Sequence, residues 1–178
     1  MSILAADILF KFSVDTTVGD ATAGNAAGSL GDYISTTEIT DATLNNLFDD
    51  VSGDDNASSD VEYRGFFVHN NHATLTWEAP TIWLDAETGG GADIAIALDG
   101  VGVSVKGDST QQMELIADED TAPSGESFSS PTTKGAGLVM PNIPAGSVHG
   151  IWVRRTAANS AALDNDDVTI KVEGDTAA

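Results

Sequence analysis

The chain has 178 residues, a length that suits one domain with a substantial hydrophobic core. It carries 28 acidic side chains against 7 Lys and Arg, so its net charge at pH 7 is −21. A surface this negative repels phosphate groups, which argues against nucleic acids and anionic membranes as partners. The chain contains no cysteine, which excludes disulfides, thiolate zinc sites and a cysteine nucleophile.

Alternating apolar and polar residues predict short strands along most of the chain. The expected strands are 7–14, 61–68, 73–78, 81–84, 93–98, 112–116, 137–140, 148–156 and 167–173. The one helix of note is expected at 40–50, where Thr40 or Asp41 would cap it. We therefore predict an all-β fold: an antiparallel β-sandwich, jelly-roll or immunoglobulin-like, with about eight to nine strands and one short helix. Its expected core residues are Phe10, Phe12, Phe67, Leu75, Trp83, Ile96, Val153 and Ile170.

The connections between these strands are rich in Gly, Asn, Asp and Ser. We expect residues 1–178 to form a single β-sandwich domain, with 15–32 as a flexible or partner-ordered segment. The glycines at 89–91 predict a hairpin loop between the strands at 81–85 and 93–98. Residues 118–134 predict a long exposed loop, and loops of that length are usually functional or ordered by a partner.

Dense acidic residues offer the strongest local candidate for a metal site. Asp49, Asp50, Asp54 and Asp55 are possible Ca²⁺ ligands, with a solvated acidic loop as the alternative. An EF-hand needs Gly at its sixth position, and counting from Asp50 places Gly53 fourth. The run at 164–167 is a second acidic candidate, which a hairpin turn also explains. No other cofactor is expected.

Histidine, serine and glycine do not form a recognisable catalytic arrangement. His69 and His72 stand three residues apart, but the only other histidine is His149, so a zinc site would lack ligands. The serines around Ser127 lack the second glycine of a nucleophile elbow. We therefore expect no enzymatic activity. Three tryptophans either stack on sugars or pack in the core or an interface: Trp77, Trp83 and Trp152.

Basic residues are scarce, so each one is informative. Arg64, Arg154 and Arg155 are candidate interface residues, and the alternative is an ion pair within the chain. Arg154 and Arg155 are adjacent on one expected strand, so their side chains should point to opposite faces of the sheet.

Three segments resemble parts of small virion structural proteins from tailed bacteriophages. They are 60–71 (DVEYRGFFVHNN), 144–156 (PAGSVHGIWVRRT) and 167–176 (DVTIKVEGDT). The resemblance implies a virion component that is assembled in the host cytoplasm. The expected role is a capsid decoration (cement) protein that binds the outer capsid surface and stabilises the head. A tail, baseplate or fibre protein with a host-glycan binding role is the alternative. The expected partners are the major capsid protein and further copies of the chain, as a homotrimer with a dimer as the alternative, and no nucleic acid or membrane is expected.

Overall fold

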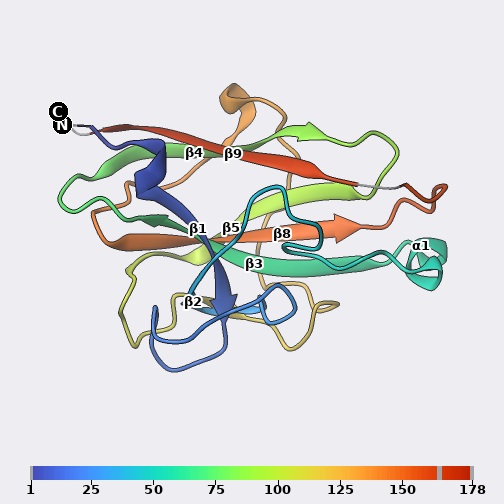
Figure 1. The fold of residues 1–178 in the computed structure, drawn as a ribbon, viewed down its shortest axis with the longest axis horizontal. Helices are drawn as coiled ribbons and strands as arrows, with labels where there is room; N and C mark the ends of the chain where they lie inside the picture. Colours follow the sequence, from blue (N-terminus) through green and yellow to red (C-terminus); the bar gives the residue numbers. More distant parts are fainter. Residues whose placement is uncertain (1, 164–165, 177–178) are drawn as a thin grey trace.

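The computed structural model describes residues 2–163 and 166–176, which fold into two antiparallel β layers. The larger sheet has the strand order β5-β8-β3-β1-β2-β6, and the smaller has the order β7-β4-β9 (Figure 1). The predicted all-β sandwich is therefore confirmed. The strands are β1 (Ile8–Val14), β2 (Gly31–Glu38), β3 (Val61–Asn70), β4 (Trp77–Glu87), β5 (Asp93–Val105), β6 (Met113–Leu115), β7 (Leu138–Val139), β8 (Ser147–Thr156) and β9 (Val168–Thr176).

The predicted helix at 40–50 is wrong, and the short α-helix lies just after it as α1 (Gly53–Ser58). Ala42 and Asn45 adopt positive φ angles of 53° and 56°, which interrupt any helix at 40–50. A capping box starts α1: the Asp55 N–H donates to Ser52 Oγ (3.2 Å), and the Ser52 N–H donates to the Asp55 carboxylate (2.9 Å).

The predicted hairpin at 89–91 is wrong because the chain changes sheet there. β4 belongs to the smaller sheet and β5 to the larger, so the glycines at 89–91 form a crossover between layers rather than a hairpin. The connection from β8 to β9 also crosses between the sheets. Within it, residues 164–165 of the acidic run lie outside the described residues. The expected strand at 73–78 is mostly wrong, since residues 73–76 lie in the connection between β3 and β4 and only Trp77 and Glu78 are in a strand. These two residues and the expected strand at 81–84 belong to one irregular strand, β4, whose pairing register shifts between Glu78 and Thr81.

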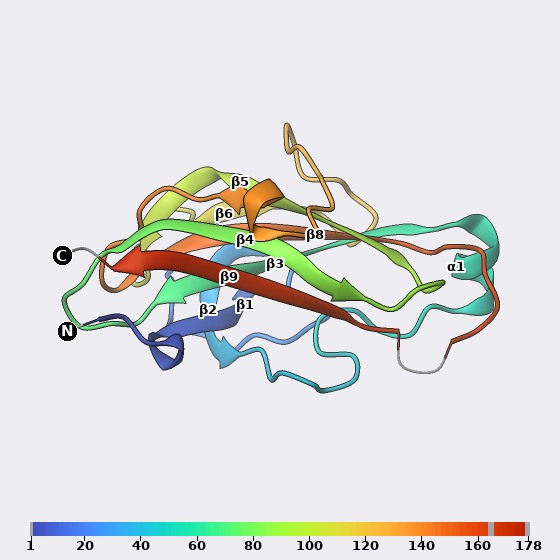
Figure 2. The same ribbon diagram turned by 90° about the horizontal axis from the view of Figure 1, so that it is seen from above.

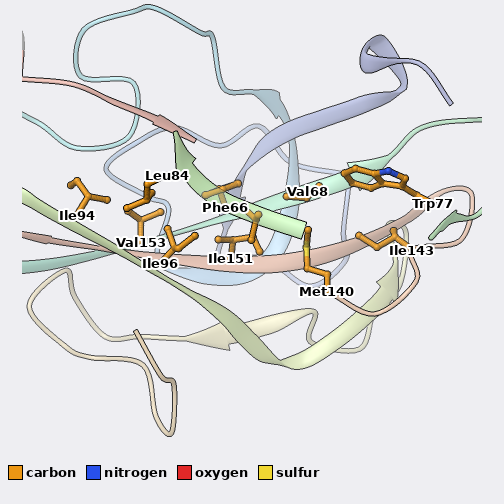
Figure 3. Packing of buried hydrophobic residues seen from close by; sticks show 11 residues of the cluster. Phe66, Val68, Trp77, Leu84, Ile94, Ile96, Met140, Ile143, Ile151 and Val153 are labelled. Atoms are coloured by element: carbon orange, nitrogen blue, oxygen red, sulfur yellow. The ribbon is translucent and has the colours of Figure 1, made fainter. Parts of the chain in front are cut away.

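The main hydrophobic core fills the space between the two sheets (Figure 3). Alternate residues of the paired strands β3 and β8 point into it, as in the pair Phe66 and Ile151. Of the predicted core residues, five are buried and three are half-buried. The buried ones are Phe12, Phe67, Trp83, Ile96 and Val153, and the half-buried ones are Phe10, Leu75 and Ile170.

A second hydrophobic cluster covers the opposite face of the larger sheet, which curls so that its two edge strands meet (Figure 2). Asp99 of β5 accepts the Glu114 N–H of β6 (3.1 Å) and Trp152 Nε1–H of β8 (2.9 Å). Gly65 leaves room for Met113, since a Cβ atom there would lie 2.7 Å from Met113 Cε. The cluster comprises Ile34, Phe67, Ala97, Met113, Ile116, Val148 and Trp152.

The long segments between strands are held by the chain itself. In the segment 15–32, the Gly19 N–H donates to the Asp108 carbonyl (2.9 Å), Ser29 is buried, and residues 31–32 already belong to β2. The loop 118–134 bonds to both sheets. Ser129 bridges to Ile96 of β5, and the Pro131 carbonyl accepts the Leu84 N–H of β4 (2.8 Å).

Candidate functional site

Arg155, one of the three candidate interface arginines, lies inside the fold on β8. Its Nε donates to Glu62 Oε2 (2.7 Å), its guanidinium also bonds Asp49, and it lies 4.8 Å from the centre of the Phe48 ring. Burial raises the pKa of Glu62 above its usual value, although Arg155 acts in the opposite direction. Arg155 is 8% exposed, so its contacts are made with its own chain.

Arg64 lies on the same face of the larger sheet and is 3% exposed. It forms an ion pair with Glu119 and lies 5.8 Å from the Phe48 ring centre. The internal ion pair, which the sequence left open as one of two alternatives, is thus present for both Arg64 and Arg155.

Arg154 differs from its neighbour because its side chain points to the opposite face, as the strand alternation predicts. It is half-buried and lies 5.3 Å from the centre of the Phe128 ring. Its Nε is buried without a hydrogen-bond partner. Among the described residues, every Lys and Arg except Arg154 forms an ion pair with a carboxylate.

The candidate calcium ligands are not gathered around one point. Asp49 contacts Arg155, Asp50 is exposed, and Asp54 and Asp55 lie in the first turn of α1. In the described ranges, no group of three or more His, Asp or Glu side chains is placed to hold a metal ion.

The loop at 118–120 adds further carboxylates beside α1. Partial desolvation, followed by the nearby carboxylates of Asp60, Glu119, Asp118 and Asp55, raises the pKa of Asp120. This end of the molecule is therefore strongly negative.

The histidines and tryptophans belong mainly to the interior. His69 is 1% exposed, and burial followed by the cations Lys11 and Lys106 lowers its pKa to about 4. His149 is also buried, and burial lowers its pKa. His72 is half-buried, and its Nδ1 accepts the N–H groups of two neighbouring residues in its turn. Trp77, Trp83 and Trp152 are at most 5% exposed, so they do not offer a ring face to a sugar.

A groove of about 2090 Å³ lies between β9 and β1, and the segments 39–50 and 157–163 also line it. Sequence reasoning missed this groove. Half-buried apolar side chains line it: Ile8, Phe10, Ile39, Leu47, Val168, Ile170 and Val172. Three exposed leucines extend its apolar surface: Leu4 (64% exposed), Leu44 (73%) and Leu163 (44%).

The groove also has acidic sides. Its carboxylates are those of Glu38, Asp41, Asp49, Asp50, Asp166, Asp167, Glu173 and Asp175. The cations along it are already paired: Lys134 with Glu173, Lys171 with Asp85, and Arg155 with Glu62 and Asp49. The site is therefore apolar in its lining and negative at its margins, a combination that suits a basic, amphipathic ligand.

No helix among the described residues has the length and apolar character needed to cross a membrane. Neither a protein-family model, nor a curated protein, nor a solved structure matches this chain.

Proposed function

We propose that this chain is a structural attachment protein of a tailed-bacteriophage particle, a decoration protein that binds the outer capsid surface and stabilises the head. The observation that carries the proposal is the apolar groove with acidic margins on a two-layer β domain. An exposed apolar surface of this kind is typical of a protein-binding site. The three segments that resemble virion proteins fall on β3, β8 and β9 and the residues beside them.

The charge distribution supports attachment to another protein. Because the other cations are engaged in ion pairs within the described chain, Arg154 is the arginine with capacity to pair with a carboxylate of a partner. The remaining surface charge is dominated by carboxylates, which keep neighbouring particles apart and favour a basic counterpart on the capsid.

The copy number of the chain in purified particles tests the proposal. A decoration protein is present in numbers comparable to the major capsid protein, whereas a tail, baseplate or fibre protein is present in a few to tens of copies. Quantitative gel densitometry against the major capsid band measures this ratio. A ratio near that of a tail component, or absence from the particles, contradicts the decoration role.

Self-association as a homotrimer is part of the same proposal. Most soluble assemblies are closed and symmetric, and a trimer allows one decoration unit to clamp several capsid subunits at once. Analytical ultracentrifugation of the free protein, together with the occupancy of each attachment point on the particle, measures this. A strict monomer both in solution and on the particle contradicts it.

A further inference from the structure

β9 forms one edge of the smaller sheet and pairs only with β4 in the described part of the chain (Figure 2). Leu84 of β4 donates its N–H to Pro131, away from β9. Its register partner on β9 is Ile170. Leu84 and Ile170 therefore form a non-hydrogen-bonded pair of the antiparallel ladder. In such a pair both residues direct their N–H and C=O groups away from the other strand, so those of Ile170 point away from β4.

Two further residues of β9 direct their backbone groups away from β4. Because backbone groups alternate along a strand, Val168 and Val172 direct their N–H and C=O groups to the same side as Ile170, away from β4. None of these three residues has a backbone hydrogen bond to any described residue on that side. The groove therefore presents a row of unpaired donors and acceptors, the template that an added strand requires.

Beside this edge of β9, the apolar residues of β1 in the larger sheet are only partly covered. On the larger sheet, Ile151 and Val153 of β8 are at most 1% exposed, whereas Ile8 and Phe10 of β1 are only half-buried. Three strands of the smaller sheet face six strands of the larger, so the layer ends before β1 is covered. A strand added beside β9 would place alternate side chains over these residues and over Leu47.

The charge of the groove determines what kind of strand fits. Eight carboxylates line it, and the cations beside them are already paired. A second copy that paired its own β9 with this edge would bring the same eight groove carboxylates against them, so such pairing is repelled. A segment with apolar residues at alternate positions and Lys or Arg at its ends complements both the lining and the margins.

We propose that the groove binds an extended, basic-flanked segment of a partner protein, which pairs with the free edge of β9 as a fourth strand of the smaller sheet. This inference deepens the attachment role proposed above and rests on it in one respect: both use the same groove, and here the kind of partner segment is named.

A peptide-binding experiment tests the proposal on the free protein. The probe is a short fluorescein-labelled peptide in which Val and Thr alternate and a pair of Lys residues stands at each end. Fluorescence anisotropy should show saturable binding, with binding at least about tenfold weaker for the same peptide with Glu in place of Lys. Replacing the central Val of the peptide by Pro should also abolish binding, because Pro cannot donate to a ladder.

Two variants at one position separate edge pairing from general apolar binding. Val172→Pro removes an N–H that points into the groove and leaves the bonds to β4, so it should abolish binding. Val172→Thr keeps both the N–H and the branched shape, so it should bind within about twofold of the original protein. Thermal melting of both variants shows whether each is folded.

Hydrogen exchange on the unaltered protein gives an answer that does not depend on the variants folding. Peptide binding should slow exchange of the Val168, Ile170 and Val172 amides, with little change on the far edge of the sheet at β7. Equal binding of the Lys- and Glu-flanked peptides, binding by folded Val172→Pro, unchanged exchange at β9, or a β9-dependent dimer that excludes the peptide would each overturn the proposal. The copy number of the chain in particles decides the attachment role separately.

Discussion

The two faces of the larger sheet are closed in different ways. One face is curled onto itself, and its interior residues Phe67, Met113 and Trp152 are fully buried. The other face is covered by the three strands of the smaller sheet, and burial decreases from β8 toward β1 until the groove opens. The same sheet thus has a sealed side and an incompletely covered side.

The sealed face should mainly determine the stability of the protein, and the open face should mainly determine what it binds. The sealed face depends on Asp99, which gathers donors from β5, β6 and β8. The open face keeps apolar side chains and strand-edge groups in contact with solvent. Substitutions on the sealed face should therefore reduce stability, and substitutions in the groove should change binding more than stability.

The largest effect is expected from Asp99→Ala. The substitution leaves the Val101 N–H, the Glu114 N–H and Trp152 Nε1–H without their acceptor, and Asp99 is only 3% exposed. We expect a loss of about 4 kcal/mol in the free energy of unfolding, measured by urea denaturation. The control Asp93→Ala, on the exposed start of β5, should change it by less than about 0.5 kcal/mol. Equal effects would show that Asp99 does not close the curled sheet.

Arg155→Ala should have the next largest effect. It removes the partner of Glu62, which is 9% exposed, and leaves a buried carboxylate unpaired. We expect a loss of about 3 kcal/mol. Arg154→Ala should cost about 1 kcal/mol, because it loses only the contact with Phe128.

The two arginine variants also differ in what they should do to attachment. If Arg154 meets a partner, its loss should lower particle occupancy at an almost unchanged melting temperature. Arg155→Ala should lower both together. If neither substitution changes the particle occupancy or the melting temperature, the two arginines contribute to neither attachment nor folding.

His69 gives the sealed face a pH dependence. Its pKa is lowered to about 4 in the folded protein from 6.5, so the folded state favours the neutral ring. Between those values the unfolded chain binds more protons, so stability is full above pH 6.5 and falls as the pH drops toward 4. The difference of about 2.5 pKa units corresponds to a loss of about 3 kcal/mol from this group.

His69→Gln isolates this contribution from that of the carboxylates, which also titrate near pH 4. Urea midpoints of the original and the variant, measured from pH 7 to pH 4, should converge as the pH falls. Parallel curves would mean that His69 does not titrate differently in the folded and unfolded states.

The sequence predicts the strands best where β-branched and aromatic residues are dense or alternate with polar ones. β9 alternates half-buried and exposed residues, whereas β3 and β8 are buried on both faces, and for β1, β3, β8 and β9 the expected boundaries lie within three residues of the observed ones. β2 was not expected, because its sequence, GDYISTTE, has only two large apolar residues, Tyr33 and Ile34, and they are adjacent rather than alternating. The error at 89–91 has another cause: a run of glycines suits a hairpin and a crossover equally well.

The candidate site was much less predictable. The opposite orientation of Arg154 and Arg155 follows from strand alternation alone. The partners of Arg155 do not, since Glu62 and Asp49 are brought to it by long-range strand pairing and a loop. The groove combines β1, the segment 39–50 and β9, and no local pattern indicates that these meet.

The smallest effect on stability is expected from Leu44→Ser, in the groove. Leu44 is 73% exposed, so its removal from water contributes little to folding and the free energy of unfolding should change by less than about 0.5 kcal/mol. The same leucine adds apolar surface that a bound strand would cover, so binding of the Lys-flanked peptide should weaken about threefold. Val139→Ser is a matched control, since Val139 is 60% exposed but does not line the groove. Weakening of binding by Leu44→Ser alone would locate the binding surface on the open face, and equal weakening by both variants would show that the peptide recognises exposed apolar side chains in general.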